Sequence, residues 1–185
     1  MDLFNQNTIQ NILPFDGEAI YKGVIFSRKE SEAHYKNLFE EIPWENDQAI
    51  VFGKHYITKR KVAWFGDKPY SYKYSGITKQ AHIWTPELLL LKQKIEEISA
   101  TTYNSCLLNL YHTGDEGMAW HSDAEKTLLD NGTIASVTLG AERKFSFKHK
   151  ESKQRIDVLL ENGSLLLMKG TTQKNWLHRL PPTKK

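Results

Sequence analysis

The sequence predicts an α+β fold whose core is a sandwich or jelly roll of antiparallel strands. Two observations lead to this prediction. Two amphipathic helical patterns lie in the first hundred residues, and short strand-like runs follow one another from Tyr103 to the end of the 185-residue chain. Helices first and many antiparallel strands afterwards are typical of this class. The length suits one domain, over residues 1–185, that is large enough to bury a core.

The first helix is expected between Ser27 and Pro43. Ser27 and Glu30 have the spacing of a capping box, in which each side chain accepts a hydrogen bond from the other residue's backbone. The apolar residues that follow are spaced i, i+3, i+4, i+7, and they are Tyr35, Leu38, Phe39 and Ile42. This spacing predicts one apolar face turned toward a sheet.

The second helix is expected to begin after Thr85. Thr85 is a suitable N-cap, and Pro86 suits the first helical position because its missing N–H has no partner there in any case. One apolar stripe follows, made of Leu88, Leu91, Ile95 and Ile98. This helix should also lie against a sheet.

Six strand-like runs, each bounded by turn residues, make up the C-terminal part of the chain. They are SCLLNLYH, TIASVTLG, RKFSFKHK, RIDVLLE, SLLLMKG and NWLHRL. Strict alternation over Lys144–Lys148 predicts one wet and one buried face. Asn131-Gly132 and Asn162-Gly163 are turn signals, and we expect the second to join its flanking runs as a tight hairpin.

Composition excludes several classes of protein. Cys106 is the only cysteine, so an internal disulfide scaffold is excluded and a reducing compartment is favoured. No run approaches the roughly 20 apolar residues of a membrane span, and the start lacks the pattern of a secretory signal. We therefore expect a soluble intracellular protein without membrane partners. Cytoplasm is the default location, or the nucleus in a eukaryote, and a monomer is the default state.

The net charge of +3 conceals an uneven distribution. Residues 1–49 carry four basic and nine acidic side chains, whereas residues 50–80 carry seven basic and one acidic. Seven of the chain's aromatic residues are interleaved with these basic ones. Cations that neutralise phosphates and aromatic faces that stack on bases suit a nucleic-acid partner. A solvated basic hairpin over an aromatic core is the alternative.

The pattern His121-Ser122-Asp123 is a candidate metal site. In extended chain, positions i and i+2 project to one side, so this imidazole and carboxylate can converge. His178, in the last strand-like run, could supply a third ligand. Two histidines and one carboxylate form the facial triad of non-haem Fe(II). On spacing alone, a chance H-x-D remains an alternative.

The order of several blocks resembles the AlkB family of Fe(II)- and 2-oxoglutarate-dependent dioxygenases, and above all its nucleic-acid demethylases of eukaryotic type. The blocks are VFGK, KRKVAWFGD, YSYKYSGI, Asn109-Leu110-Tyr111, His121-Ser122-Asp123, IASVTLGAERKFSFKH, NGSLLLMKG and NWLHRLP. They span about residues 50–185. Residues 1–49 would be an N-terminal extension with a helix, 50–80 a nucleotide-recognition segment and 103–185 the core.

The resemblance implies a double-stranded β-helix with flanking N-terminal helices. It implies that His121, Asp123 and His178 bind Fe(II) and that Asn109 and Tyr111 contact 2-oxoglutarate, although the last two could be ordinary strand residues. The implied reaction is oxidative demethylation of bases of the N1-methyladenine and N3-methylcytosine type in DNA repair. It uses O2 and releases formaldehyde, succinate and CO2.

The same resemblance assigns residues to the nucleic acid. Val51, Phe52 and Gly53 match a hydrophobic finger that fills the gap left by a flipped base, and Arg60 matches a DNA-contacting position. Three further residues would line the base pocket, and they are Tyr72, Tyr74 and Glu125. Glu125 would accept from an exocyclic amine, or it could be a plain surface acid.

The family binds 2-oxoglutarate through two arginines spaced R-x5-R shortly after the last iron ligand. Arg143 and Arg179 do not stand at matching positions, and the sequence ends at Lys185. Lysine would not reproduce the bidentate pairing. We therefore expect the natural chain to continue with a strand that carries these arginines. The alternative functions are an oxygenase acting on RNA or protein and a catalytically silent nucleic-acid-binding jelly roll.

Overall fold

The computed structural model describes residues 10–51, 53–74, 77–123 and 129–184, with only the backbone at 49–51, 72–74 and 77–78. The chain forms two compact units. The first comprises residues 1–33 and 118–181, and the second comprises residues 34–117 and 182–185. The prediction of a single domain over residues 1–185 stays a prediction. Neither of the two long helices is long and apolar enough to cross a membrane.

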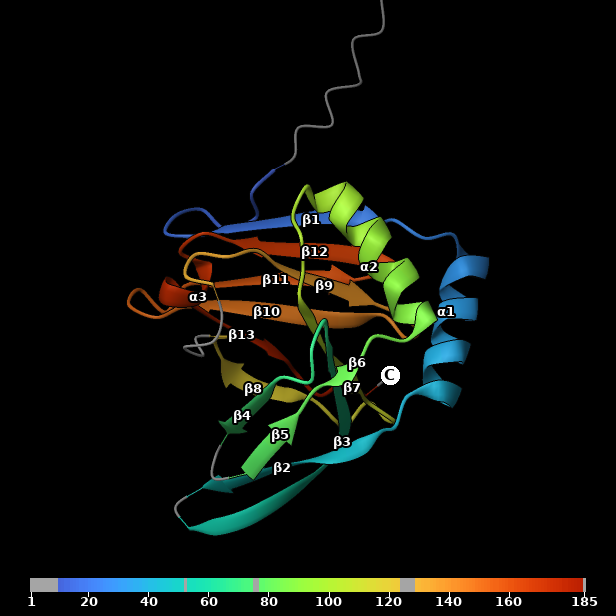
Figure 1. Ribbon diagram of the computed structural model, residues 1–185. Coiled ribbons are helices and arrows are strands. Elements are labelled where there is room, and N and C mark those ends of the chain that lie inside the picture. The colour runs from blue at the N-terminus through green and yellow to red at the C-terminus, as the bar shows by residue number, and fades with distance from the viewer. Residues whose placement is uncertain (1–9, 52, 75–76, 124–128, 185) are drawn as a thin grey trace, which may run out of the picture. The chain divides into compact units, whose positions relative to one another are not determined.

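The first unit contains two antiparallel sheets (Figure 1). One has the strand order β1-β12-β9, formed by β1 (Glu18–Val24), β12 (Ser164–Lys169) and β9 (Ile134–Thr138). The other has the order β11-β10-β13-β8, formed by β11 (Arg155–Leu160), β10 (Arg143–His149), β13 (Trp176–Leu180) and β8 (Met118–His121). The short helix α3 (Thr172–Asn175) precedes β13.

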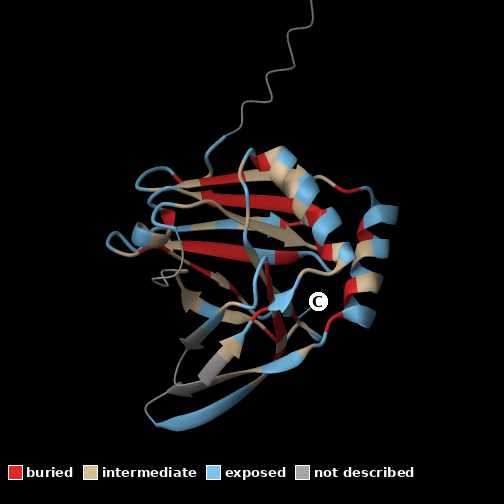
Figure 2. Ribbon diagram, viewed as in Figure 1, coloured by how far each residue is buried: buried red, intermediate tan, exposed pale blue. Residues whose placement is uncertain are grey.

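The core of the first unit follows the predicted strand pattern. On β10, Phe145 and Phe147 are buried and Lys144 is exposed, as the alternation predicts, but Ser146, on the face expected to be wet, is buried as well. On β12, three consecutive leucines, 165–167, are fully buried, so this strand is covered on both faces (Figure 2). Trp176 on β13 is also fully buried, and its indole N–H donates to the carbonyl of Phe15.

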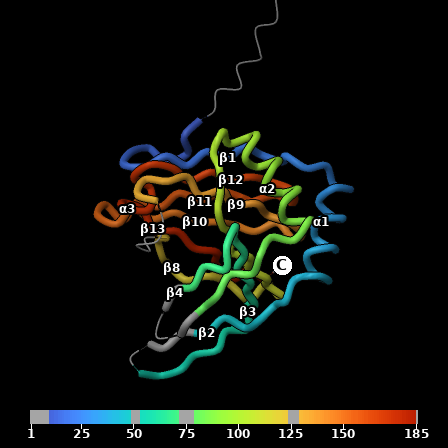
Figure 3. The backbone as a smooth tube through the Cα atoms, in the orientation of Figure 1, coloured from blue at the N-terminus to red at the C-terminus, as the bar shows by residue number. Residues whose placement is uncertain are grey.

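The first strand of this unit was missed by the sequence prediction. β1 lies in the segment expected to be an extension and a helix, yet it pairs with β12 over four consecutive positions from Glu18↔Lys169 to Tyr21↔Leu166. The two strands, distant in sequence, run side by side in the backbone trace (Figure 3). Ala19 and Ile20 are buried here, but two apolar residues are too weak a pattern to predict a strand.

The expected hairpin at Asn162-Gly163 is wrong. The turn joins β11 to β12, but these strands belong to different sheets, because β11 pairs with β10 and β12 pairs with β1 and β9. Gly163 has φ +77°, as the turn chemistry predicts. Its carbonyl accepts from the N–H groups of Ile25 and Phe26, and its own N–H donates to Thr138. The turn therefore crosses between sheets.

The second unit contains most of α1 (Arg28–Glu41), all of α2 (Pro86–Ser99) and a sheet of order β2-β3-β6 with β7 on β3. These strands are β2 (Glu45–Val51), β3 (Lys54–Gly66), β6 (His82–Ile83) and β7 (Ser105–Leu110). A separate hairpin joins β4 (Ser71–Tyr74) to β5 (Ile77–Gln80).

Both helices begin where the sequence predicts. Ser27 N–H donates to Glu30 and Glu30 N–H donates to Ser27 Oγ, at 2.7 and 3.3 Å, which completes the capping box. Thr85 caps α2 by accepting from Leu88 N–H. The apolar face of α1 is narrower than predicted, because Leu38 and Ile42 are buried whereas Tyr35 and Phe39 are exposed and stack on each other.

Candidate metal centre

Two neighbouring strands of the first unit bring His121 and His178 together. His121 ends β8, His178 lies in the middle of β13, and the two residues are direct Cα partners in the antiparallel register. Their ring centroids are 4.2 Å apart, with one ring edge toward the other. Asp123 follows two residues after His121, at the point where β8 has ended.

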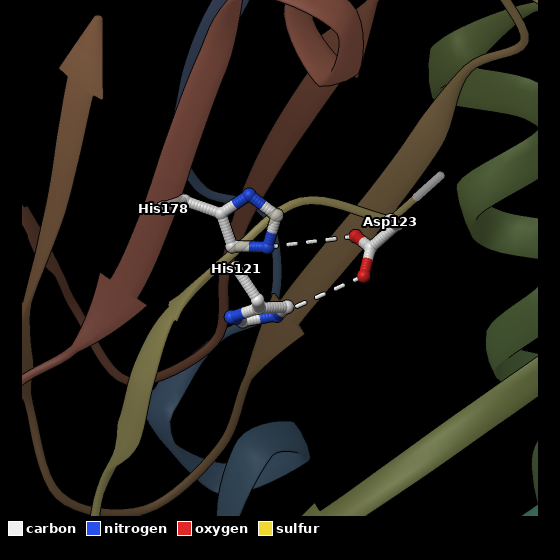
Figure 4. Close-up of side chains that lie close together, drawn as sticks. All are labelled: His121, Asp123 and His178. Atoms are coloured by element: carbon white, nitrogen blue, oxygen red, sulfur yellow. Dashed lines mark ion pairs between the residues drawn. The ribbon is translucent and has the colours of Figure 1, made fainter. Parts of the chain in front are cut away.

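The Asp123 carboxylate points at both imidazoles (Figure 4). Oδ2 lies 3.5 Å from Nε2 of His178, and Oδ1 lies 3.7 Å from Nε2 of His121. One ligand atom from each of the three residues lies within 4.8 Å of the others. Such an arrangement on one side of a site leaves other positions open for exogenous ligands, as in the facial triad of non-haem Fe(II).

His121 is held in the tautomer that a metal needs. Its Nδ1 lies 2.9 Å from the carbonyl oxygen of Ala119, so this nitrogen carries the proton and donates it. Nε2, the nitrogen nearer Asp123, is then left with its lone pair. A metal-binding histidine is commonly oriented by a hydrogen bond from its other nitrogen in this way.

His178 is buried as a neutral imidazole. Burial is the main cause that lowers its pKa to about 3, and a positive charge on His121 or Lys150 would act in the same direction. Phe145 stacks on the His178 ring at 5.4 Å, and Phe147 lies edge-on at 6.4 Å. A neutral imidazole is the form that binds metal. The donor set and its protonation therefore fit a divalent iron ion.

Hydrogen bonds that were not predicted from the sequence hold the segment around Asp123 in place. Its backbone N–H donates to Oε1 of Gln173 on α3 at 2.9 Å. The Lys150 ammonium donates to Ser122 Oγ and to the carbonyl of Gln173, at 3.2 and 2.9 Å. No local motif marks Gln173 or Lys150, so only the tertiary structure reveals these contacts.

The predicted 2-oxoglutarate contacts lie in the second unit. Asn109 is an exposed residue on β7, and Tyr111 is a half-buried residue just after it. A guanidinium N–H of Arg60 donates to Oδ1 of Asn109. This bond leaves the Nδ2 donors of Asn109 as the groups suited to a carboxylate. The co-substrate role of both residues remains a prediction.

Arg60, predicted to contact DNA, is only 7% exposed in its side chain. It binds the Asp47 carboxylate as well as Asn109, and Lys79 binds the same carboxylate. A direct phosphate contact would require Arg60 to leave both partners, at the cost of leaving Asp47 with one cation less. The DNA contact of Arg60 stays a prediction.

The structure describes the finger only in part. β2 and β3 pair up to Val51↔Lys54. Gly53 is exposed with φ +74°, as a tight turn requires. Phe52 and Glu125 lie outside the described residues, and so do the side chains of Val51, Tyr72 and Tyr74. Tyr72 and Tyr74 both lie on β4.

This fold and this ligand set define a class of metal-dependent oxygenase, and the comparisons agree. The 2OG-Fe(II) oxygenase superfamily matches residues 17–185. Two solved structures share the fold. OsALKBH1 has a TM-score of 0.59 at 15% identity, covering 93% of this chain and 88% of its own. A 2OG-Fe(II) oxygenase family oxidoreductase from Burkholderia pseudomallei has a TM-score of 0.56 at 14% sequence identity, and the match covers 89% of this chain and 78% of that one. The expected jelly-roll fold is thereby confirmed.

Curated relatives narrow the family. The alpha-ketoglutarate-dependent dioxygenase alkB homolog 3 of Bos taurus is 35% identical over 83% of this chain and 56% of its own. The DNA oxidative demethylase ALKBH2 of Homo sapiens is 34% identical over 88% of this chain and 66% of its own length. The ALKBH2 of Mus musculus is 32% identical over 88% of this chain and 72% of its own length. The chain thus spans little more than half of the alkB homolog 3 relative. It belongs to the AlkB family of 2OG-Fe(II) oxygenases, which assigns Fe(II) to the site and 2-oxoglutarate as co-substrate.

Proposed function

We propose that the protein repairs alkylated nucleic acid by oxidative demethylation of bases of the N1-methyladenine and N3-methylcytosine type. The convergence of His121, Asp123 and His178 in a protein similar to DNA oxidative demethylases is the observation that carries this proposal. Nucleic acid is then its partner, the protein acts as a monomer inside the cell, and no membrane is involved.

Bound Fe(II), together with 2-oxoglutarate and O2, supplies the oxidation that inserts one oxygen atom into a methyl C–H bond. The second oxygen atom enters succinate as CO2 is lost. The hydroxymethyl group on the cationic base nitrogen then leaves as formaldehyde, the electrons of the N–C bond return to the nitrogen as a lone pair, and the proton of the former hydroxyl group is released to water.

In this scheme the chain's own residues bind the metal ion and hold its ligands in the right orientation. His121 and His178 offer neutral nitrogens, and Asp123 offers the negative charge that partly balances a divalent ion. The hydrogen bond from His121 Nδ1 to Ala119 and the one from Asp123 N–H to Gln173 keep two ligands in place before the metal arrives. Phe145 and Phe147 keep water from one side of His178.

The substrate side rests on the segment 50–80. We assign Val51, Phe52 and Gly53 to the finger, and Tyr72, Tyr74 and Glu125 to the base pocket. Asn109 and Tyr111 bind 2-oxoglutarate, and Arg60 orients Asn109 in addition to any contact with DNA. The exposed stem of the β2–β3 hairpin, with Lys54 and Tyr56 on its surface, supports this assignment (Figure 2).

Formaldehyde release from a methylated oligonucleotide, dependent on iron and 2-oxoglutarate, tests the proposal. His121→Ala and Asp123→Ala should each abolish release and leave oligonucleotide affinity within about threefold, because neither residue is placed on the nucleic acid. His82→Gln, an exposed histidine on β6, is the control and should keep activity.

Three outcomes would redirect the proposal. Full turnover by His121→Ala would refute the iron site. Turnover only on methylated RNA, or only on a peptide, would favour the alternative of an oxygenase that acts on RNA or protein. Tight binding of methylated oligonucleotides without any turnover would favour a silent binding module.

A further inference from the structure

The sheet that carries His121 and His178 also has an opposite face, which bears a cluster of cations. Side chains alternate along a strand, so the neighbours of the ligands point to the opposite side of the sheet. Trp120 precedes His121 on β8, and Arg179 follows His178 on β13. Both half-buried side chains therefore lie on the outer face of the sheet β11-β10-β13-β8.

Three cations from three strands gather over the Trp120 ring. The Lys148 ammonium and the Arg179 guanidinium carbon each lie 4.5 Å from the ring centroid, and the Arg155 guanidinium carbon lies 5.9 Å from it. We call these four residues the Trp120 patch. Cation–π attraction holds the cations near the indole.

The electrostatics of the patch are unfavourable in the free protein. Lys148 and Arg155 are direct partners in the register of β10 and β11, and like charges directly opposite each other destabilise a sheet. Arg179 is paired with Ser146, two residues before Lys148, so its charge lies on the same face. The three positive charges repel one another across a few ångströms.

Within the described part of the chain, no carboxylate lies at ion-pair distance from any of these three cations. The acid that the register places on the same face, Asp157, pairs with Lys144 at 3.3 Å. The charge of Arg179 also helps to lower the pKa of Asp157, so this carboxylate offsets part of the positive charge of the patch from a distance. The Nε of Arg179 is buried without a hydrogen-bond partner among the described residues. A buried guanidinium donor without an acceptor is costly unless a ligand supplies the acceptor.

We propose that the Trp120 patch binds the phosphate backbone of the nucleic-acid strand, outside the catalytic site. Guanidinium groups bind phosphate oxygens bidentately, and an anion there would relieve the repulsion among the three cations. The patch shares no residue with the basic segment 50–80, so it adds a second set of cations to those already assigned to the nucleic acid. The choice of nucleic acid as the polyanion rests on the proposed function.

Charge reversal tests the patch. The double variant Lys148→Glu/Arg155→Glu should raise the Kd for an unmodified 20-nucleotide single strand at least tenfold at 100 mM salt, by fluorescence anisotropy. The slope of log K against log salt should fall by about 1.4, because each lost phosphate contact on a single strand contributes about 0.7. The matched control Lys29→Glu/Lys174→Glu has the same charge change on exposed residues and should shift the Kd less than threefold.

Equal losses in both double variants would overturn the proposal, because a net-charge effect alone would then explain them. An unchanged Kd in the patch variant would overturn it as well. If the Glu variant does not fold, Lys148→Gln/Arg155→Gln removes the same charges without reversing them, and it should still weaken binding at least threefold. Displacement of the oligonucleotide by millimolar inorganic phosphate at constant ionic strength would indicate a site for a small free anion instead.

Turnover separates this proposal from the proposed function. The patch variant should keep its kcat/KM on a methylated trinucleotide, which is too short to reach both sites, and lose it on a methylated 20-nucleotide strand. If the unaltered protein releases no formaldehyde from any oligonucleotide, the proposed function fails. The anisotropy measurement on the unmodified strand still decides whether the patch binds phosphate.

Discussion

The backbone N–H of Asp123 donates a 2.9 Å hydrogen bond to the side-chain oxygen of Gln173. The bond joins the segment after β8 to helix α3, and the carbonyl of the same Gln173 accepts from Lys150. Asp123 lies beyond the end of its strand, so the ladder of the sheet no longer fixes its backbone. Gln173 thus orients the one carboxylate ligand of the site.

Replacing Gln173 by Leu should therefore weaken metal binding without removing a ligand. Loss of a residue that orients a ligand typically costs about 10- to 100-fold in metal affinity, and we expect a loss in this range. Titration with Co(II), followed by its visible absorption, measures the affinity directly. Lys174→Leu, on the neighbouring exposed position of α3, should leave it unchanged. An affinity equal to that of the parent protein would show that Asp123 is held by other contacts.

Gly163 is needed where the chain crosses from β11 to β12. A Cβ at this position would lie 2.3 Å from Ser31 Oγ and 2.9 Å from the carbonyl oxygen of Phe26, and φ is +77°. Gly163→Ala should lower the free energy of unfolding by about 3 kcal/mol or more, since the left-handed conformation alone costs about 1–2 kcal/mol. Urea unfolding monitored by circular dichroism measures the change.

Gly170→Ala is the matched control for that substitution. Gly170 also has a positive φ, +54°, but no atom lies within 4 Å of the position that its Cβ would take. Only the backbone cost of about 1–2 kcal/mol should appear. Equal destabilisation by the two variants would mean that Ser31 and Phe26 move aside easily.

The sequence predicts much of this fold because its local signals are strong. The cap at Thr85 and the H-x-D spacing each depend on neighbouring residues, and the structure contains both features. The alternation in Lys144–Lys148 is present only in part, because Ser146 is buried on the face expected to be wet. Asn162-Gly163 shows the limit. Its turn chemistry is local and was predicted, whereas the partner of the strand that follows is set by packing with β1.

The parts of the site that the sequence did not reveal depend on contacts between distant residues. Gln173 meets Asp123 through tertiary structure, and the cations of the Trp120 patch come from three strands. Neither arrangement involves a characteristic spacing of residues along the sequence, so neither could be predicted from it. His178 was placed in the site by family resemblance, and its register with His121 supplies the physical reason.

Phe52 should matter more for duplex than for single-stranded substrate. Phe52 lies outside the described residues, but its neighbour Gly53 is exposed and has no atom within 4 Å of the position that a Cβ would take. The finger proposed for this segment would fill the gap that a flipped base leaves in a duplex, and a single strand has no such gap. Phe52→Ala should reduce kcat/KM about tenfold or more on duplex and less than threefold on a single strand.

Tyr56→Ala provides the control on the same hairpin. Tyr56 is 51% exposed on β3, below the tip, and it is a comparable aromatic residue. Its removal should change duplex and single-strand turnover by the same factor. Equal losses on both substrates in Phe52→Ala would argue against a gap-filling finger and for a general contact with the strand.

The stability of the metal-free protein should decrease as the pH is lowered, because of His178. Burial holds the pKa of this imidazole at about 3 in the folded state, against the ordinary 6.5 that applies in the unfolded chain. Between these values the unfolded state binds a proton that the folded state does not. Stability is therefore full above pH 6.5 and decreases as pH falls toward 3, by about 1.4 kcal/mol per pH unit for this single group.

Urea unfolding between pH 7.5 and pH 5, in the presence of a chelator, isolates this effect. The chelator is needed because metal binding adds a pH dependence of its own. Most carboxylates remain ionised in this range, so the slope comes mainly from histidines. His178→Gln should flatten the slope, whereas His82→Gln, which removes an exposed histidine, should leave it unchanged. A slope that survives in His178→Gln would mean that another buried group takes up the proton.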